Sequence, residues 1–96
     1  MITRYIKIIG RVQGVGFRRW AERTAEKHHI SGWVRNLSDG SVEIMMKGET
    51  ADVDAFLSAC QSGPAFASVI GVQPVVIPTS TPPPIHDGVF ESVASA

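Results

Sequence analysis

The sequence has a single cysteine, no long hydrophobic run and no excess of charge of either sign. Cys60 alone can form neither an internal disulfide nor a cysteine-based zinc site. Nine basic and nine acidic side chains give a formal net charge of zero, which removes the broad positive field needed for non-specific nucleic-acid binding. No stretch approaches the ~18–20 apolar residues of a membrane span, and the N-terminus does not resemble a secretory signal. These absences predict a soluble, cytoplasmic protein that binds neither nucleic acid nor membrane.

Histidines are also few and scattered. His28, His29 and His86 have no accompanying cluster of acidic ligands, so the sequence predicts no metal site and no cofactor. A chain of 96 residues is long enough for one small two-layer core, and we therefore expect a single domain over residues 1–96. We expect this domain to act as a monomer.

Hydrophobic periodicity organises the first half of the chain. Alternating apolar residues predict a strand that ends in a glycine-rich turn near Val12. Glycine and proline are then absent over residues 17–29, where one apolar face predicts a helix. Two further strands are expected over residues 33–37 and 41–47.

The turn between these two strands predicts their register. A two-residue Asp-Gly loop would set Arg35 opposite Ile44 and mix a charge into the apolar face. A three-residue loop with Gly40 in the left-handed conformation sets Val34 opposite Ile44 and Arg35 opposite Glu43. We favour the second arrangement, which places Asn36 on the inward face at the very end of its strand.

The second half is expected to add a helix, an edge strand and an irregular loop. Thr50 is expected to cap the helix. Residues 67–77 predict a fourth strand, which Pro74 places at an edge of the sheet because proline cannot donate to a ladder. The proline-rich stretch 79–89 is expected to be an irregular surface loop, followed by a possible short extra strand over 90–93.

The order strand, helix, strand, strand, helix, strand predicts an α+β fold. We expect a ferredoxin-like two-layer sandwich (βαββαβ), in which an antiparallel sheet carries both helices on one face. Such a fold by itself names no function.

The segment that points to a function is the glycine-rich turn over residues 10–18, G-R-V-Q-G-V-G-F-R, which is a candidate anion-binding loop. A strand that turns through glycines into a helix aims several backbone N–H groups at one point, where the helix dipole adds positive potential. Arg18, in the first helical turn, is able to grip two oxygens of an anion bound there. The Gly-Lys-Ser/Thr of a Walker loop is absent, and Arg19 stands where a dinucleotide loop has its third glycine.

Together with W-V-R-N at 33–36 and D-G-S-V-E at 39–43, this turn closely resembles the acylphosphatase family. The likeness covers residues 4 to about 70 and fades after Ile70. It implies the ferredoxin-like fold and hydrolysis of the carboxyl-phosphate bond of acyl phosphates without a metal. By position it makes Arg18 the phosphate-binding arginine and Asn36 the residue that orients the attacking water. The remaining residues of the implied phosphate cradle are Gln13, Gly14, Val15, Gly16 and Phe17.

The residue types suit this reaction. The leaving group of an acyl phosphate is a carboxylate, whose pKa of about 4 lets it depart without a proton. A phosphomonoester expels an alkoxide, which generally needs an acid, a metal or a covalent relay. The motif contains no His, Cys, Ser or carboxylate pair, so charge stabilisation and positioning remain. We hypothesise that a phosphate oxygen of the substrate accepts the proton of the water.

Two other functions compete with this interpretation. The same loop would suit an acyl- or carbamoyl-phosphate-binding module of a larger carbamoyltransferase, but a long multidomain chain would then follow Ala96. An RNA-binding domain would need aromatic stacking platforms on its central strands, but those strands offer Ile6, Ile8, Val42 and Ile44, and the sequence has no RNP1-like run.

Other notable residues are expected to be structural. Cys60 is expected to be a core residue, and Trp20 and Trp33 are expected to be packing or rim residues and not base-stacking platforms. Arg19, Arg23 and Arg35 are expected to form a solvated basic face, and the alternative is that one of them attracts the substrate electrostatically.

Overall fold

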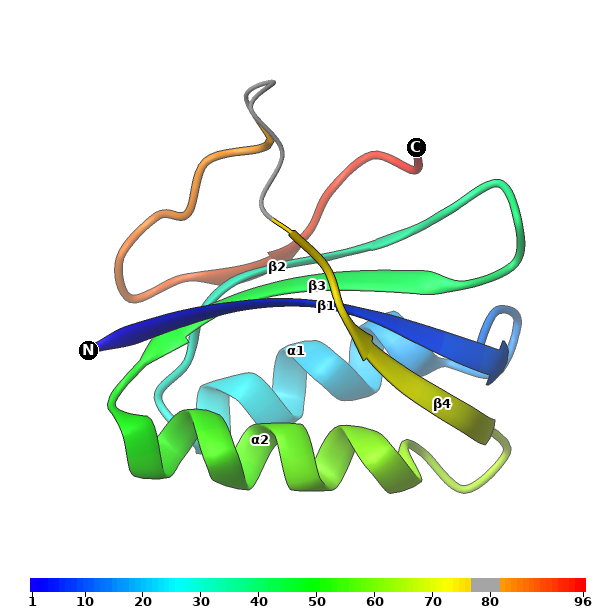
Figure 1. Ribbon diagram of the computed structural model, residues 1–96, viewed down its shortest axis with the longest axis horizontal. Helices are drawn as coiled ribbons and strands as arrows, with labels where there is room; N and C mark the ends of the chain where they lie inside the picture. The colour runs from blue at the N-terminus through cyan, green and yellow to red at the C-terminus, as the bar shows by residue number, and fades with distance from the viewer. Residues whose placement is uncertain (77–81) are drawn as a thin grey trace.

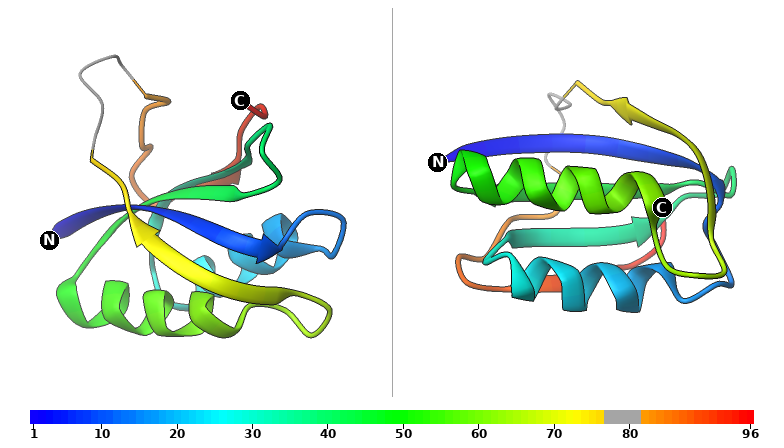
Figure 2. Two further views of the ribbon diagram at one scale, coloured as in Figure 1. Left: turned by 45° about the vertical axis from the view of Figure 1, so that its right-hand side comes forward. Right: turned by 90° about the horizontal axis from the view of Figure 1, so that it is seen from below.

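The protein folds into two layers, a five-stranded sheet and a pair of helices (Figure 1). The structure is a computed structural model that describes residues 1–76 and 82–96. Both helices lie on one face of the sheet, whose strand order is β4-β1-β3-β2-β5 (Figure 2). The predicted ferredoxin-like sandwich is confirmed. The elements are β1 (Ile2–Arg11), α1 (Phe17–Lys27), β2 (Ser31–Asn36), β3 (Val42–Gly48), α2 (Thr50–Ser62), β4 (Ser68–Pro74) and β5 (Phe90–Ser92).

The short extra strand makes the sheet mixed. β1, β2, β3 and β4 pair antiparallel as predicted, whereas β5 pairs parallel to β2, with Val34 opposite Ser92. Hydrogen bonds from the Gly32 amide to the Val89 carbonyl (2.9 Å) and from the Val93 amide to the Val34 carbonyl (3.0 Å) hold it there. The short extra strand expected near residues 90–93 is therefore present, and its parallel direction, which the sequence pattern did not predict, is what makes this edge of the sheet differ from the rest.

The hairpin register follows the prediction. Val34 pairs with Ile44 and Arg35 with Glu43. The Leu37 amide donates to the Ser41 carbonyl at 2.9 Å, which closes the three-residue loop 38–40, and Gly40 has a φ of 92°. Asn36 consequently lies opposite Val42, at the strand end on the helix-covered face.

The main core lies between the sheet and the helices. Every second residue of the inner strands and one stripe of each helix meet there, which buries the apolar area that stabilises the fold. Cys60 belongs to this core as predicted, and its burial raises the pKa of the thiol to about 12. The fully buried core residues include Ile8, Val12, Ala21, Ala25, Val34, Val42, Ile44, Met46, Val53, Phe56 and Cys60.

Besides shifts of one or two residues at the ends of β2 and β3, three predictions about element ends need correction. Thr50 is the first residue of α2, Glu49 occupies the N-cap position and no side-chain cap bond is made, so the predicted Thr50 cap was wrong. Helix α1 stops at Lys27, because His29 takes a left-handed φ of 59° and turns the chain into β2. Strand β4 ends at Pro74, and position 77, where the strand was expected to end, lies outside the described residues.

The helix-free face of the sheet carries a second, smaller cluster. Tyr5, Trp33 and Met45 are buried there. They are covered by Val75 and by two residues of the C-terminal segment (residues 82–96), Ile85 and Val93. The Trp33 indole donates to the Pro83 carbonyl at 2.8 Å. Two aromatic side chains thus lie on central strands, but both are buried and neither is exposed as a base-stacking platform.

Arg35 belongs to this covered face. Its guanidinium pairs with the Glu43 carboxylate at 2.7 Å and lies 4.8 Å from the centre of the Trp33 ring. The expectation that Arg35 is part of a solvated basic face was therefore wrong. Strand alternation does place Arg35 on the helix-free face, but its guanidinium there contacts Glu43 and Trp33.

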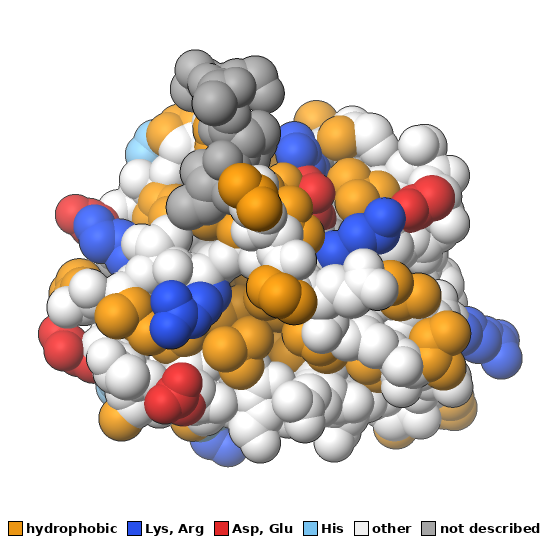
Figure 3. Space-filling model, in the orientation of Figure 1, with side chains coloured by type: hydrophobic (Ala, Val, Ile, Leu, Met, Phe, Trp, Pro, Cys, Tyr) orange, Lys and Arg blue, Asp and Glu red, His pale blue; other side chains and the backbone are white. Residues whose placement is uncertain are grey.

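Strand β4 forms the opposite edge of the sheet, as Pro74 predicted. Hydrophobic side chains reach the surface on the face of the molecule shown in Figure 3. The exposed large hydrophobic residues in and next to β4 are Phe66, Ile70 and Val76. No helix in the described part of the chain is long and apolar enough to cross a membrane. Within residues 1–76 and 82–96, no group of three His, Cys, Asp or Glu side chains is placed to hold a metal ion.

Candidate active site

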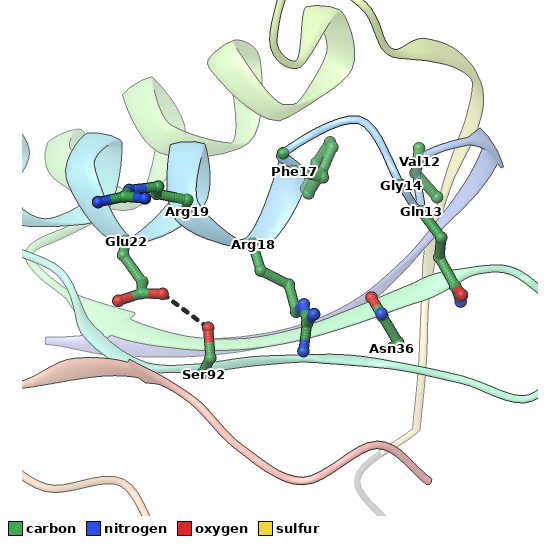
Figure 4. A pocket seen from close by; sticks show the side chains of 10 residues that line it. Val12, Gln13, Gly14, Phe17, Arg18, Arg19, Glu22, Asn36 and Ser92 are labelled. Carbon is green, nitrogen blue, oxygen red and sulfur yellow. Dashed lines mark hydrogen bonds between the residues drawn. The ribbon is translucent and has the colours of Figure 1, made fainter.

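A pocket of about 550 Å³ opens where the loop after β1, the N-terminal half of α1 and the end of β2 meet (Figure 4). Six of the seven predicted site residues line it. The exception is Val15, whose half-buried side chain packs against the core. The lining residues are Val12, Gln13, Gly14, Gly16, Phe17, Arg18, Arg19, Glu22, Asn36 and Ser92.

The glycines of the loop are required for their backbone conformation. Gly14 and Gly16 have φ angles of 73° and 77°, a left-handed region that other residues rarely adopt. An added Cβ at either position would meet nothing within 4 Å, so space is not the constraint.

This loop leaves several backbone donors free. Gly16 caps α1 without a side-chain hydrogen bond, so the first amides of the helix have no acceptor in the described chain. Within that part of the chain, the amides of residues 13–16 likewise donate to no backbone carbonyl. An anion at this helix N-terminus would satisfy these donors and meet the positive end of the helix dipole.

The side chain of Gln13 fastens the loop to the β2–β3 hairpin. Its Nε2 donates to the Leu37 carbonyl and to the Ser41 carbonyl, both at 2.8 Å. The resemblance assigned Gln13 only to the phosphate cradle. The structure adds a clamp between residues more than twenty positions apart, which no local pattern in the sequence reveals.

The hairpin loop has a second anchor. Lys7 Nζ donates to Asp39 Oδ2 at 2.6 Å, and the Ser41 amide donates to Asp39 Oδ1 at 2.9 Å. The bond from Lys7, with the bonds from Ser41, holds the pKa of Asp39 well below its usual range. The loop that follows Asn36 is therefore fixed from both sides.

We expect Gln13→Glu to destabilise the protein by about 2 kcal/mol at pH 7. The substitution keeps the shape of the side chain but removes both donated hydrogen bonds and sets a carboxylate against two carbonyl oxygens. Urea unfolding measures the loss, and Gln73→Glu on the exposed face of β4 is the matched control. An equal effect of the two substitutions would show that the clamp contributes nothing.

Arg18 and Asn36 approach the pocket from different elements. The guanidinium extends from the first turn of α1 and the amide from the end of β2, and the two point toward one another (Figure 4). Arg18 forms no ion pair with any described residue, and its side chain is exposed. Both predicted functional side chains thus share one pocket.

The C-terminal segment holds the backbone around Asn36. The Ala96 amide donates to the Asn36 carbonyl at 3.0 Å, and the Ser38 amide donates to the Ala96 carbonyl at 2.9 Å. These bonds leave the Asn36 side chain free to face the pocket.

Four residues of the lining were not among the predicted site residues, and the first of them is Val12, which follows β1 at the start of the loop. Arg19 and Glu22 come from α1, and Ser92 comes from β5. The Ser92 hydroxyl donates to Glu22 Oε1 at 2.7 Å. Their separation of 70 residues left no signal in the sequence that would have paired them.

The lining therefore offers mainly donors and positive charge. Peptide amides and Arg18 suit a phosphoryl or carboxylate group, and the Asn36 amide is able to donate to or accept from a water molecule. The lining contains neither a histidine nor a cysteine, and Glu22 is its single carboxylate. Such a site is equipped for binding and orientation.

Comparison with known proteins gives a consistent result. The acylphosphatase family model matches residues 4–87, past the point at which the likeness was expected to fade. An acylphosphatase of Alcanivorax borkumensis is 46% identical over 69 residues, covering 72% of this chain and 75% of that protein. The crystal structure of acylphosphatase from Bacillus subtilis has a TM-score of 0.79 at 34% identity and covers 97% of this chain and 99% of its own. Full-length HypF, in a phosphate- and nucleotide-bound form, has a TM-score of 0.78 at 32% identity, matching 97% of this chain but 12% of its own.

Proposed function

The chain belongs to the acylphosphatase family and is an enzyme of that kind, and we propose that it hydrolyses acyl phosphates to a carboxylate and inorganic phosphate in the pocket described above. The main observation that supports hydrolysis in this pocket is that the Arg18 and Asn36 side chains face each other there, beside a loop whose backbone amides are free. The Arg18 guanidinium suits the phosphoryl oxygens, and the Asn36 amide suits the water molecule that attacks phosphorus.

In this proposal the phosphoryl group binds to the amides of residues 13–17 and to the guanidinium of Arg18. The planar fork of arginine holds two oxygens at once and stabilises the charge that spreads over them during transfer. The Asn36 amide orients a water molecule in line with the departing carboxylate.

No general acid is needed in this scheme. The carboxylate leaves as an anion, and a phosphate oxygen of the substrate accepts the proton of the attacking water. The Glu22 carboxylate accepts a hydrogen bond from the Ser92 hydroxyl. The scheme assigns Glu22 no part in proton transfer. We further propose that the enzyme acts as a monomer and without a metal ion, because one chain supplies every group that the scheme uses. We also propose a cytoplasmic location, which suits a chain whose single cysteine, Cys60, is a free thiol.

Hydrolysis of benzoyl phosphate tests the function, with p-nitrophenyl phosphate as the control substrate. We expect turnover of the acyl phosphate, unchanged by EDTA, and negligible turnover of the monoester. Equal rates on the two substrates, no activity on either, or a large loss in EDTA that Mg²⁺ restores would contradict the proposal.

The match to HypF supports one alternative, a module that binds acyl or carbamoyl phosphate for a larger protein. Such a module would bind inorganic phosphate without hydrolysing benzoyl phosphate. The same assay, combined with phosphate titration, separates the two functions.

A further inference from the structure

We propose that Ser92 is a positioning residue that keeps the Glu22 carboxylate away from Arg18, so that the guanidinium is available to phosphate. This inference rests on the proposed function, because it assumes that Arg18 binds the phosphoryl group. It gives β5 and the C-terminal segment a part in the reaction.

Arg18 and Glu22 are spaced on α1 so that their side chains are able to form an ion pair. Glu22 lies four residues after Arg18, and side chains at this spacing are neighbours on one face of a helix. Both side chains line the same pocket. A carboxylate free to move there would pair with the guanidinium and occupy the N–H groups that phosphate needs.

The observed geometry shows a different pairing. Glu22 Oε1 accepts a hydrogen bond of 2.7 Å from the Ser92 hydroxyl, drawn as the dashed line in Figure 4. Arg18 extends instead toward Asn36, and the described residues give it no acidic partner. A carboxylate already bonded to a hydroxyl has less to gain from the neighbouring cation.

The position of Ser92 is fixed by the sheet. It lies opposite Val34 in the parallel pairing of β5 with β2, and the next amide, that of Val93, donates to the Val34 carbonyl at 3.0 Å. The hydroxyl is thus held beside the second turn of α1 by backbone bonds that a side-chain substitution leaves intact. Ser92→Ala therefore removes the hydroxyl with little effect on the strand.

We expect Ser92→Ala to weaken binding of inorganic phosphate about two- to five-fold, the range for competition by one exposed ion pair. KM for benzoyl phosphate should rise by the same factor with kcat nearly unchanged, because bound substrate displaces the carboxylate. The loss should shrink at high salt, which screens an exposed pair.

Rescue by a second substitution is the decisive observation. Gln at position 22 keeps the shape of the side chain and has no charge to offer Arg18, so the double variant Ser92→Ala, Glu22→Gln should bind phosphate as tightly as Glu22→Gln alone. Ser92→Thr, which keeps the hydroxyl, should resemble the wild type. Ser95→Ala is the matched control, an exposed serine in the same segment whose side chain bonds to no described residue.

Isothermal titration with inorganic phosphate and steady-state kinetics on benzoyl phosphate test the inference together. Unchanged binding in Ser92→Ala, or a loss that persists in the Glu22→Gln background, would overturn it and leave the proposed function untouched. A wild-type protein that neither binds phosphate nor hydrolyses benzoyl phosphate would instead overturn the proposed function.

Discussion

Replacing Asn36 by alanine should lower the rate of acyl phosphate hydrolysis at least about 100-fold while the affinity for inorganic phosphate stays nearly unchanged. The reason is that the Asn36 amide is proposed to orient only the water, and the loss of a positioning group alone costs at least about this factor. The phosphate ligands, Arg18 and the loop amides, are intact in this variant. Comparison of kcat with the phosphate dissociation constant measures the two effects separately.

Thermal unfolding of the same variant provides the control, because asparagine beside a turn also stabilises backbone. Asn36→Asp adds an electrostatic check, since a carboxylate that faces bound phosphate should weaken its binding as well as the rate. A variant that keeps its catalytic rate but melts at a lower temperature would show that Asn36 is structural only.

Arg18→Ala should lower both the rate of hydrolysis and the affinity for phosphate. We expect kcat/KM to fall by at least about 1,000-fold, the lower end for an arginine that stabilises phosphoryl transfer. The guanidinium contacts the phosphoryl group in the ground state and in the transition state, so phosphate affinity should fall together with turnover. Arg18→Lys should recover only part of the loss, because a point charge cannot hold two oxygens in a fixed plane.

Arg23→Ala is the matched control for this substitution. Arg23 is an exposed arginine of the same helix that does not line the pocket, so its removal changes the net charge equally. Equal losses of kcat/KM in Arg18→Ala and Arg23→Ala would show that Arg18 contributes only general positive potential. Wild-type activity in Arg18→Lys would contradict the bidentate grip.

The sequence predicted the parts of the site that depend on local rules. The three-residue loop ending at Gly40 determined the hairpin register, and that register placed Asn36 at the inward end of β2. The glycines at 14 and 16 marked a backbone turn with free amides before α1. Turn geometry and strand alternation act over a few residues and are therefore visible in the sequence.

The missing parts depend on where the chain goes after residue 76. The parallel pairing of β5 beside β2 brings Ser92 to the pocket, and Ile85 and Val93 pack on the cluster of Tyr5, Trp33 and Met45. Neither contact follows from the sequence pattern around those residues. The Gln13 clamp and the Lys7–Asp39 pair likewise join positions that only the assembled sheet brings together. Because such contacts have no periodic signature, they required the structure.

Hydrolysis in ¹⁸O-labelled water tests the central claim most directly. The site is proposed to hold the phosphoryl group and to direct water at phosphorus, so the enzyme-catalysed reaction on benzoyl phosphate should place the label in inorganic phosphate and leave the benzoate unlabelled. Mass spectrometry of both products, corrected for the uncatalysed reaction, gives the distribution. Label in the benzoate would mean that water attacks the acyl carbon, and it would contradict the roles assigned to Arg18, Asn36 and the loop.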